Sequence, residues 1–207
     1  MTIGAFTVYF LILARIASFL YTGIFFSIKG IPNLTKIGFS LIFSYIIYLT
    51  VSQSVIVSED LIGYSMQVIT ETIYGMALGY TTYLIFITIQ MAGQLIDIQI
   101  GFSIGAVYDP VTKNKVSIFG KFYYWLSIAL FLSLDAHEYM IAAIAKSYNI
   151  LPVGSGGLGY FTNISFVSIF TVSMKMAFQI ALPLLMILFL TDFIMGLLAR
   201  TVPQINV

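Results

Sequence analysis

Ionisable side chains within long apolar stretches are the residues of this chain that could do chemistry: Arg15, Glu71, Asp97, Lys175 and Asp192. A charged side chain at the centre of a bilayer costs roughly 2.5–3.5 kcal/mol even on the mildest scale, so such groups usually pair with one another or line a wet path. Their functional interpretation is a proton or ion relay, or the lining of a water-filled pore. Their structural interpretation is a buried polar contact between helices.

Glu71 begins a stripe that continues with Gly75 and Gly79, at positions i, i+4 and i+8 of a helix. Residues at this spacing share one helix face. The run from Gly75 to Gly79 has small residues at both ends, a pattern that lets two helix backbones approach closely. We favour helix packing over a proton relay for this stripe.

A second polar stripe lies further along the same apolar stretch. Gln90, Gln94, Asp97 and Gly101 fall within about a 60° arc of one helix. We predict a polar interface with protein or water here. For the whole chain we predict helix packing at Gly75, Gly79, Gly93 and Gly101, and buried polar roles for Arg15, Glu71, Gln90, Gln94, Asp97, Gln99, Lys175 and Asp192.

Familiar catalytic and cofactor motifs fail on their spacing. A zinc-binding His-Glu-x-x-His helix needs a second histidine four residues after His137, where the chain has Ile141, so we predict a polar loop around His137. The run from Gly154 to Gly159 matches G-x-G-x-x-G, but no βαβ unit surrounds it, and we predict a flexible loop. We expect neither an enzyme nor a cofactor.

Composition makes the chain a membrane protein. Of its 207 residues 60% are hydrophobic and 8% charged, whereas soluble proteins carry about 25% charged residues. A net charge of +1 offers no basic surface to hold nucleic acid. The absence of cysteine excludes disulfides, thiolate metal sites and cysteine nucleophiles. The apolar stretches are 3–28, 37–57, 61–108, 116–134, 139–151 and 164–199.

The lengths of these stretches do not fit a simple series of spans. A bilayer core needs about 20 helical residues, which suits the first two stretches and 116–134. The stretch 61–108 would reach about 72 Å as one helix, so it either forms a hairpin or leaves the bilayer and is buried in other protein. Stretch 164–199 poses the same choice, and Pro183 offers a kink or a break. Stretch 139–151 is too short to span and is predicted to be a half-helix or an interfacial piece.

The positive charges also fit no regular topology. If Lys29 and Lys36 lie in the cytoplasm, a double span over 61–108 would place Lys113, Lys115 and Lys121 outside, against the positive-inside tendency. We infer that the helices pack inside an assembly rather than each facing lipid.

Several blocks resemble one family of export proteins. The central run Ala92-Gly93-Gln94-Leu95-Ile96-Asp97-Ile98-Gln99-Ile100-Gly101-Phe102, followed by Asp109-Pro110, resembles the central motif of the FliR family of flagellar type III secretion. Further matches are Ala14-Arg15, Leu151-Pro152-Val153-Gly154 and the run from Gly196 to Val207. The resemblance covers the whole chain. Two departures are that relatives continue past Val207 with more hydrophobic sequence, and that many carry a small residue at the place of Asp97.

The resemblance implies an all-α fold of membrane-associated helical hairpins with long kinked helices, packed into a hetero-oligomeric pore complex. It implies a FliP-like N-terminal half at 1–108, a central loop at 109–115 and a FliQ-like C-terminal half at 116–207, incomplete at its C-terminus. The segment 104–118 would plug the channel. Its predicted gating residues are Ile104, Gly105, Ala106, Val107, Tyr108, Asp109, Pro110, Val111, Thr112, Lys113, Asn114 and Lys115.

The function implied by the resemblance is that of a structural export-gate subunit in the bacterial inner membrane, at the flagellar basal body. With FliP and FliQ it would form the channel for unfolded flagellar proteins, and it would contact FlhB and membrane lipid. Two alternatives stay open. One is the related injectisome subunit, against which the ending Pro203-Gln204-Ile205-Asn206 favours the flagellar type. The other is a small secondary transporter that uses Glu71 or Asp97 as a proton site.

Overall fold

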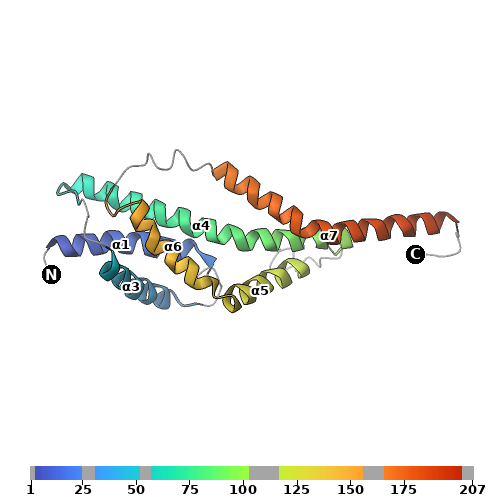
Figure 1. Cartoon of the computed structure of the whole chain (residues 1–207), viewed down its shortest axis with the longest axis horizontal. Coiled ribbons are helices and arrows are strands. Elements are labelled where there is room, and N and C mark those ends of the chain that lie inside the picture. The colour runs from blue at the N-terminus through green and yellow to red at the C-terminus, as the bar shows by residue number, and fades with distance from the viewer. Residues whose placement is uncertain (1–2, 25–30, 52–56, 103–116, 156–165, 202–207) are drawn as a thin grey trace. The chain divides into compact units, whose positions relative to one another are not determined.

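A computed structural model describes residues 3–24, 31–51, 57–102, 117–155 and 166–201. Within these ranges the chain is helical and has no strand (Figure 1). The helices are α1 (Ile3–Thr22), α3 (Asn33–Thr50), α4 (Leu61–Ile100), α5 (Ile118–Ser133), α6 (Ala136–Ile150) and α7 (Phe166–Thr201). The predicted all-α fold is confirmed, whereas the predicted plug residues 104–115 lie outside the described ranges.

Helix α4 decides between the two alternatives left open for stretch 61–108. It is one unbroken helix of 40 residues, about 60 Å long, so the hairpin alternative is wrong. No proline interrupts it, and Gly75 and Gly79 lie within it against other backbone rather than in turns. It ends where Gly101 takes a positive φ of 84°, a conformation that glycine adopts without steric cost.

The polar segment at 135–138 is not the loop that we predicted. Helices α5 and α6 are bent by 75° at a short break, and only Leu134 and Asp135 form the turn. Asp135 adopts a left-handed φ of 52°, which aspartate tolerates better than most residues. His137 and Glu138 lie in the first turn of α6, where an acidic side chain interacts favourably with the helix dipole. Helix α5 has 16 residues, short of a full span by itself, so this part of the chain would cross a membrane only together with α6.

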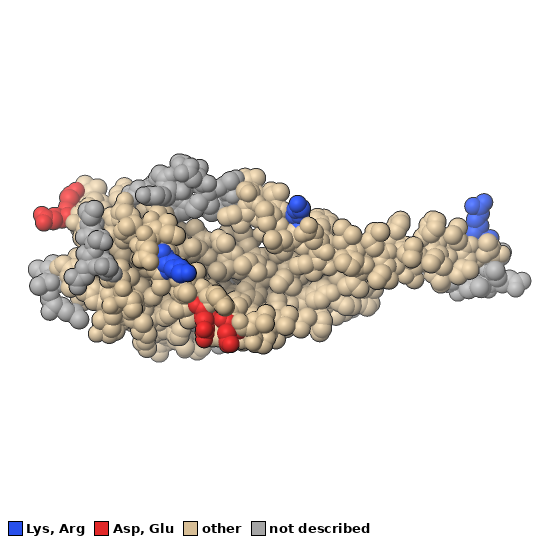
Figure 2. Space-filling view, in the orientation of Figure 1, with Lys and Arg blue, Asp and Glu red and all other residues tan. Residues whose placement is uncertain are grey.

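Among the described residues, four helices are long and apolar enough to cross a membrane: α1, α3, α4 and α7. The bent pair α5–α6 would be a fifth if it formed one span. Long apolar side chains are exposed over most of α7, where only 6% of the apolar window is buried. In Figure 2 uncharged residues cover most of the visible face, and the charged groups form a few separate patches.

The chain divides into two compact units, each built from both halves of the sequence. Unit 1 comprises Met1–Leu84 and Phe131–Val167, and unit 2 comprises Ile85–Leu130 and Ser168–Val207. In unit 1 the buried face of α1, including Leu11, Ile12 and Ile16, packs in one apolar core with residues of α3 and α6. In unit 2 a smaller core joins Ala92 and Ile96 of α4 to Ala181 of α7, with α5 side chains against it. The predicted division into FliP-like and FliQ-like halves stays a prediction.

Candidate functional site

A buried ion pair lies at the centre of unit 1. Arg15, in the middle of α1, is 0% exposed, and Glu71 on α4 is 2% exposed. The Nε atom of Arg15 lies 2.5 Å from Oε2 of Glu71. Because an isolated charge in this environment would be very costly, each side chain depends on the other.

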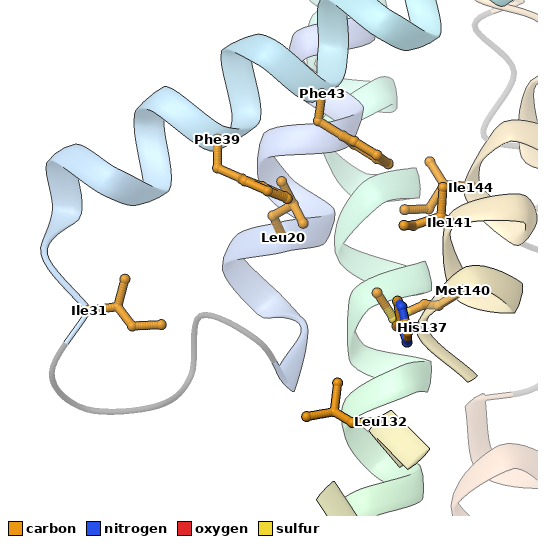
Figure 3. A pocket seen from close by; sticks show the side chains of 9 residues that line it. All are labelled: Leu20, Ile31, Phe39, Phe43, Leu132, His137, Met140, Ile141 and Ile144. Atoms are coloured by element: carbon orange, nitrogen blue, oxygen red, sulfur yellow. The ribbon is translucent and has the colours of Figure 1, made fainter. Parts of the chain in front are cut away.

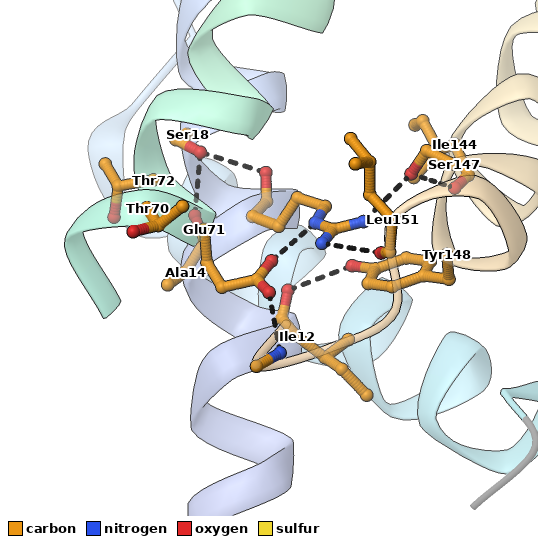
Figure 4. A network of polar contacts seen from close by, with 12 residues as sticks. Ile12, Ala14, Ser18, Thr70, Glu71, Thr72, Ile144, Ser147, Tyr148 and Leu151 are labelled. Atoms are coloured by element: carbon orange, nitrogen blue, oxygen red, sulfur yellow. Dashed lines mark hydrogen bonds and ion pairs between the residues drawn. The ribbon is translucent and has the colours of Figure 1, made fainter. Parts of the chain in front are cut away.

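The remaining polar atoms of the pair are also bonded (Figure 4). Arg15 donates from Nη1 to Oγ of Ser147, at 3.3 Å, and from Nη2 to the carbonyl oxygen of Leu151, at 3.0 Å. The second carboxylate oxygen of Glu71 accepts from the backbone N–H of Gly154, at 3.0 Å. The pair therefore holds α1, α4, the end of α6 and the residues after α6 together, and we call it the Arg15–Glu71 clasp.

Two tyrosine rings and the side chain of Gln67 lie beside the clasp. The guanidinium lies over the ring of Tyr148, 4.3 Å from its centroid, and 5.4 Å from that of Tyr74. Gln67 donates to the carbonyl oxygen of Gly154 at 2.8 Å. Gly154 thus has both its backbone groups bonded and is buried, at a φ of 76° that favours glycine. Our prediction of a flexible loop is wrong at Gly154.

These contacts limit what the clasp can do chemically. Both oxygens of Glu71 and all three nitrogens of Arg15 have hydrogen-bond partners. A proton relay needs a carboxylate that can exchange its partners with water, and this one is buried with a protein partner on each oxygen. The geometry fits a structural role better than proton transfer.

The glycines of the same stripe bring α1 and α4 very close together. A Cβ atom added at Gly75 would clash with the backbone carbonyl of Arg15 and with the hydroxyl of Ser18. One added at Gly79 would lie 2.6 Å from the carbonyl oxygen of Phe19. The two helices could not approach in this way with larger residues at these positions.

A second polar contact lies in unit 2, where α4 meets the start of α5. Asp97, which is 4% exposed, accepts from the hydroxyl of Ser117 at 2.5 Å and from the backbone N–H of Phe119 at 3.2 Å. The Ser117 hydroxyl accepts in turn from the N–H of Gly120, at 2.9 Å. Two of the N–H groups that a helix start leaves unpaired are thereby bonded, and the carboxylate lies at the positive end of the helix dipole.

Gly93 makes this approach of α4 to α5 possible. A Cβ there would lie 2.5 Å from the carbonyl oxygen of Phe119 and 2.7 Å from the Cα of Gly120. Gly101 differs, because a Cβ at Gly101 would meet no atom within 4 Å. Its positive φ ends α4, and it makes no close helix contact among the described residues.

The other predicted polar residues are not gathered at one site. Gln90 is partly exposed, and Gln94, Gln99, Lys175 and Asp192 are exposed on this single chain. Gln99 on α4 donates to Oδ2 of Asp192 on α7 at 3.1 Å. Burial of these residues in an assembly stays a prediction. Sequence reasoning missed Gln67, Ser147 and Tyr148, because no apolar period or motif marks them.

An apolar pocket of about 310 Å³ lies in unit 1 between α1, α3 and α6 (Figure 3). Leu20, Phe43 and Ile144 are among its lining residues, and His137 is the one titratable group among those that the structure describes. Nδ1 of His137 is buried without a hydrogen-bond partner among the described residues. Asp135 and Glu138 have oxygens within 4.8 Å of a nitrogen of His137, but both acids are exposed. The described lining of the pocket offers apolar contact and no catalytic group set.

Comparison with known proteins identifies the family. The family described as bacterial export proteins, family 1, matches residues 6–207. The flagellar biosynthetic protein FliR of Bacillus subtilis is 32% identical over 99% of this chain and 80% of its own length. FliR of Aquifex aeolicus is 26% identical over 93% of this chain and 74% of its own. The surface presentation of antigens protein SpaR of Shigella flexneri is 29% identical over 66% of this chain and 52% of its own.

These similarities and the apolar helices confirm the predicted location, that of a multi-pass inner-membrane protein of the flagellar basal body. They also establish the coarse role, that of a component of the flagellar export apparatus. The chain belongs to the bacterial export proteins, family 1, and within them to the FliR family.

Proposed function

We propose that the chain is a structural, non-enzymatic subunit of the flagellar export gate, which assembles with FliP and FliQ into the channel for unfolded flagellar proteins. The observation that carries this proposal is the match of residues 6–207 to one export-protein family. FlhB is proposed as a further contact, and the segment 104–118 as the plug of the closed channel. Both assignments rest on the family resemblance.

The dimensions of α4 support a place inside an assembly. At about 60 Å it is twice as long as the hydrocarbon core of a bilayer is thick. Part of this helix must therefore lie outside the hydrocarbon, although apolar side chains are exposed on it near both ends, Leu61 and Ile98 among them. Large exposed apolar surface outside lipid needs protein to cover it, which partner subunits would provide.

The two buried acids argue against the transporter alternative. A proton-coupled transporter needs an acid that gains and loses a proton as the site opens to each side. Glu71 has both oxygens bonded within the clasp, and Asp97 has both bonded at the start of α5. Each is placed to hold helices together.

Copurification tests the proposal. The chain is expressed with tagged FliP and FliQ in cells that lack their own copy of this protein. The complex is extracted in mild detergent, and its intact mass is measured by mass spectrometry. We expect one complex that contains all three proteins, together with restored motility. The proposal would be overturned if the chain purified alone and the FliP–FliQ complex had the same mass with and without it. Restored injectisome secretion without motility would favour the injectisome alternative.

A further inference from the structure

The apolar pocket of unit 1 has the size of a small-ligand site. Its volume of about 310 Å³ lies at the lower end of the range of roughly 300–1,000 Å³ that ligand pockets occupy. Among its lining residues Leu20 and Ile144 are buried, whereas Phe39 and Ile141 are 51% and 40% exposed. The pocket therefore extends from the core of unit 1 to its surface. Figure 3 shows Phe43 of α3 pointing toward the isoleucines of α6.

His137 supplies the polar contact of the described lining. Its Nδ1 atom is buried and has no hydrogen-bond partner among the described residues. A buried polar atom without a partner costs free energy, because it has lost the hydrogen bond that water would give it. The other described lining residues have apolar side chains. The pocket thus suits a hydrocarbon occupant with one hydrogen-bonding group beside His137.

The pocket lies at one end of helices α1 and α3. Leu20 is in the last turn of α1, and Ile31 lies just before α3 begins at Asn33. Both helices are long and apolar enough to cross a membrane. The ends of a helix that crosses the bilayer lie where the hydrocarbon core meets the headgroups. At this level a lipid presents an acyl chain on one side and ester oxygens and a headgroup on the other.

Two exposed acids lie beside His137. Oxygen atoms of Asp135 and Glu138 are within 4.8 Å of a nitrogen of His137 and of each other. Among the described residues neither carboxylate has a salt-bridge partner, since the ion pair there is that of Arg15 and Glu71. Two such carboxylates attract an ammonium group and repel a headgroup of net negative charge. Their charge therefore selects among the lipids that could enter the pocket.

We propose that this pocket binds an acyl chain of an aminophospholipid, a lipid whose headgroup carries an ammonium group. The acyl chain fills the space between α1, α3 and α6, and an ester carbonyl accepts a hydrogen bond from Nδ1 of His137 in the tautomer that carries its proton there. The ammonium group lies at Asp135 and Glu138. The inference rests on the membrane location of the chain and is independent of its proposed role in the export channel.

Photolabelling tests whether the pocket holds the acyl chain. The probe is a phosphatidylethanolamine with a diazirine on one acyl chain, added to the full chain in mild detergent. We expect labelled peptides from α3 and α6. Ile141→Trp should lower this labelling at least about tenfold, because the added ring excludes two or more methylene groups. Ile150→Trp is the matched control, since Ile150 is 73% exposed and lies about 180° around α6 from Ile141; its labelling should equal that of the unaltered chain.

Competition between lipids tests the headgroup. Unlabelled phosphatidylethanolamine should displace the probe at about two- to tenfold lower concentration than phosphatidylglycerol with the same acyl chains. Asp135→Asn combined with Glu138→Gln should abolish this difference, and asparagine also tolerates the left-handed conformation of residue 135. Glu59→Gln combined with Asp60→Asn, which removes two other exposed acids of unit 1, should preserve it.

Equal labelling of the Ile141→Trp and Ile150→Trp variants would overturn the inference. If Ile141→Trp does not fold, Leu132→Trp takes its place, because Leu132 also lines the pocket and is 49% exposed. Equal displacement by the two lipids would overturn the assignment of an aminophospholipid. Labelling that is lost when the chain is bound to FliP and FliQ would overturn the inference as well, because protein would then cover the pocket. A chain that is labelled as expected but copurifies with neither subunit would support the lipid site while the proposed function fails.

Discussion

Replacing Glu71 by leucine should destabilise unit 1 strongly, and the loss should be partly regained when Arg15 is replaced as well. The single change leaves Arg15 charged and 0% exposed without its carboxylate, and it leaves the N–H of Gly154 without its acceptor. Breaking a buried ion pair from one side typically costs about 3–5 kcal/mol. For a chain of this size that corresponds to a fall in melting temperature of about 6–20 °C.

The double variant Arg15→Met/Glu71→Leu removes both charges and keeps similar volumes. Replacement of a whole buried pair by apolar residues is often neutral, although here Ser147, Leu151 and Gly154 lose polar partners. We therefore expect partial recovery, with a coupling of about 2 kcal/mol between the two changes.

Thermal unfolding in detergent, followed by far-ultraviolet circular dichroism, measures these differences. Glu59→Leu is the matched control, because Glu59 is an exposed acid and its removal should change stability by no more than about 0.5 kcal/mol. The reasoning is refuted if Glu71→Leu melts like the control, or if the double variant is as unstable as the sum of the two single variants.

Three further predictions concern the other contacts. Gly79→Leu should cost about 1–3 kcal/mol by overpacking and lower complex yield, whereas Gly38→Leu, with open space around its Cβ, should be neutral or slightly stabilising; equal yields would contradict close packing. Asp97→Ala should cost about 1–3 kcal/mol in thermal unfolding and Asp97→Asn less, because an amide oxygen keeps one of the two bonds; a melting temperature unchanged by the alanine would contradict the contact with Ser117. Deletion of 107–114 should leave the complex assembled but the membrane leaky to small ions in a conductance assay, and a tight membrane would contradict a plug.

The long helices could be predicted from the sequence because their signals are local. These signals are long apolar runs in which small residues recur at the spacing of a helix. The close approach at Gly75 and Gly79 is visible in the same way, since it needs only the spacing of two glycines. The continuity of α4 could not be predicted, because an apolar run of that length suits a hairpin as well as an overlong helix.

The partners in the clasp could not be predicted for a different reason. Ser147 lies 132 residues from Arg15 in the sequence, and nothing local to either residue signals the contact. The bend before α6 likewise depends on the left-handed conformation of a single residue, Asp135. Such features are set by tertiary packing, which overrides local preference.

Site-specific crosslinking of a stalled substrate tests most directly whether exported proteins pass through a complex that contains this chain. A flagellar subunit fused to a domain that cannot unfold is arrested during export, with a photoreactive residue in its translocating segment. The absence of native cysteine allows the chain to carry one fluorescent label for detection. We predict a crosslink between the arrested subunit and this chain that disappears when export is blocked before substrate entry. Crosslinks to FliP and FliQ alone, from every position of the photoreactive residue, would contradict the account.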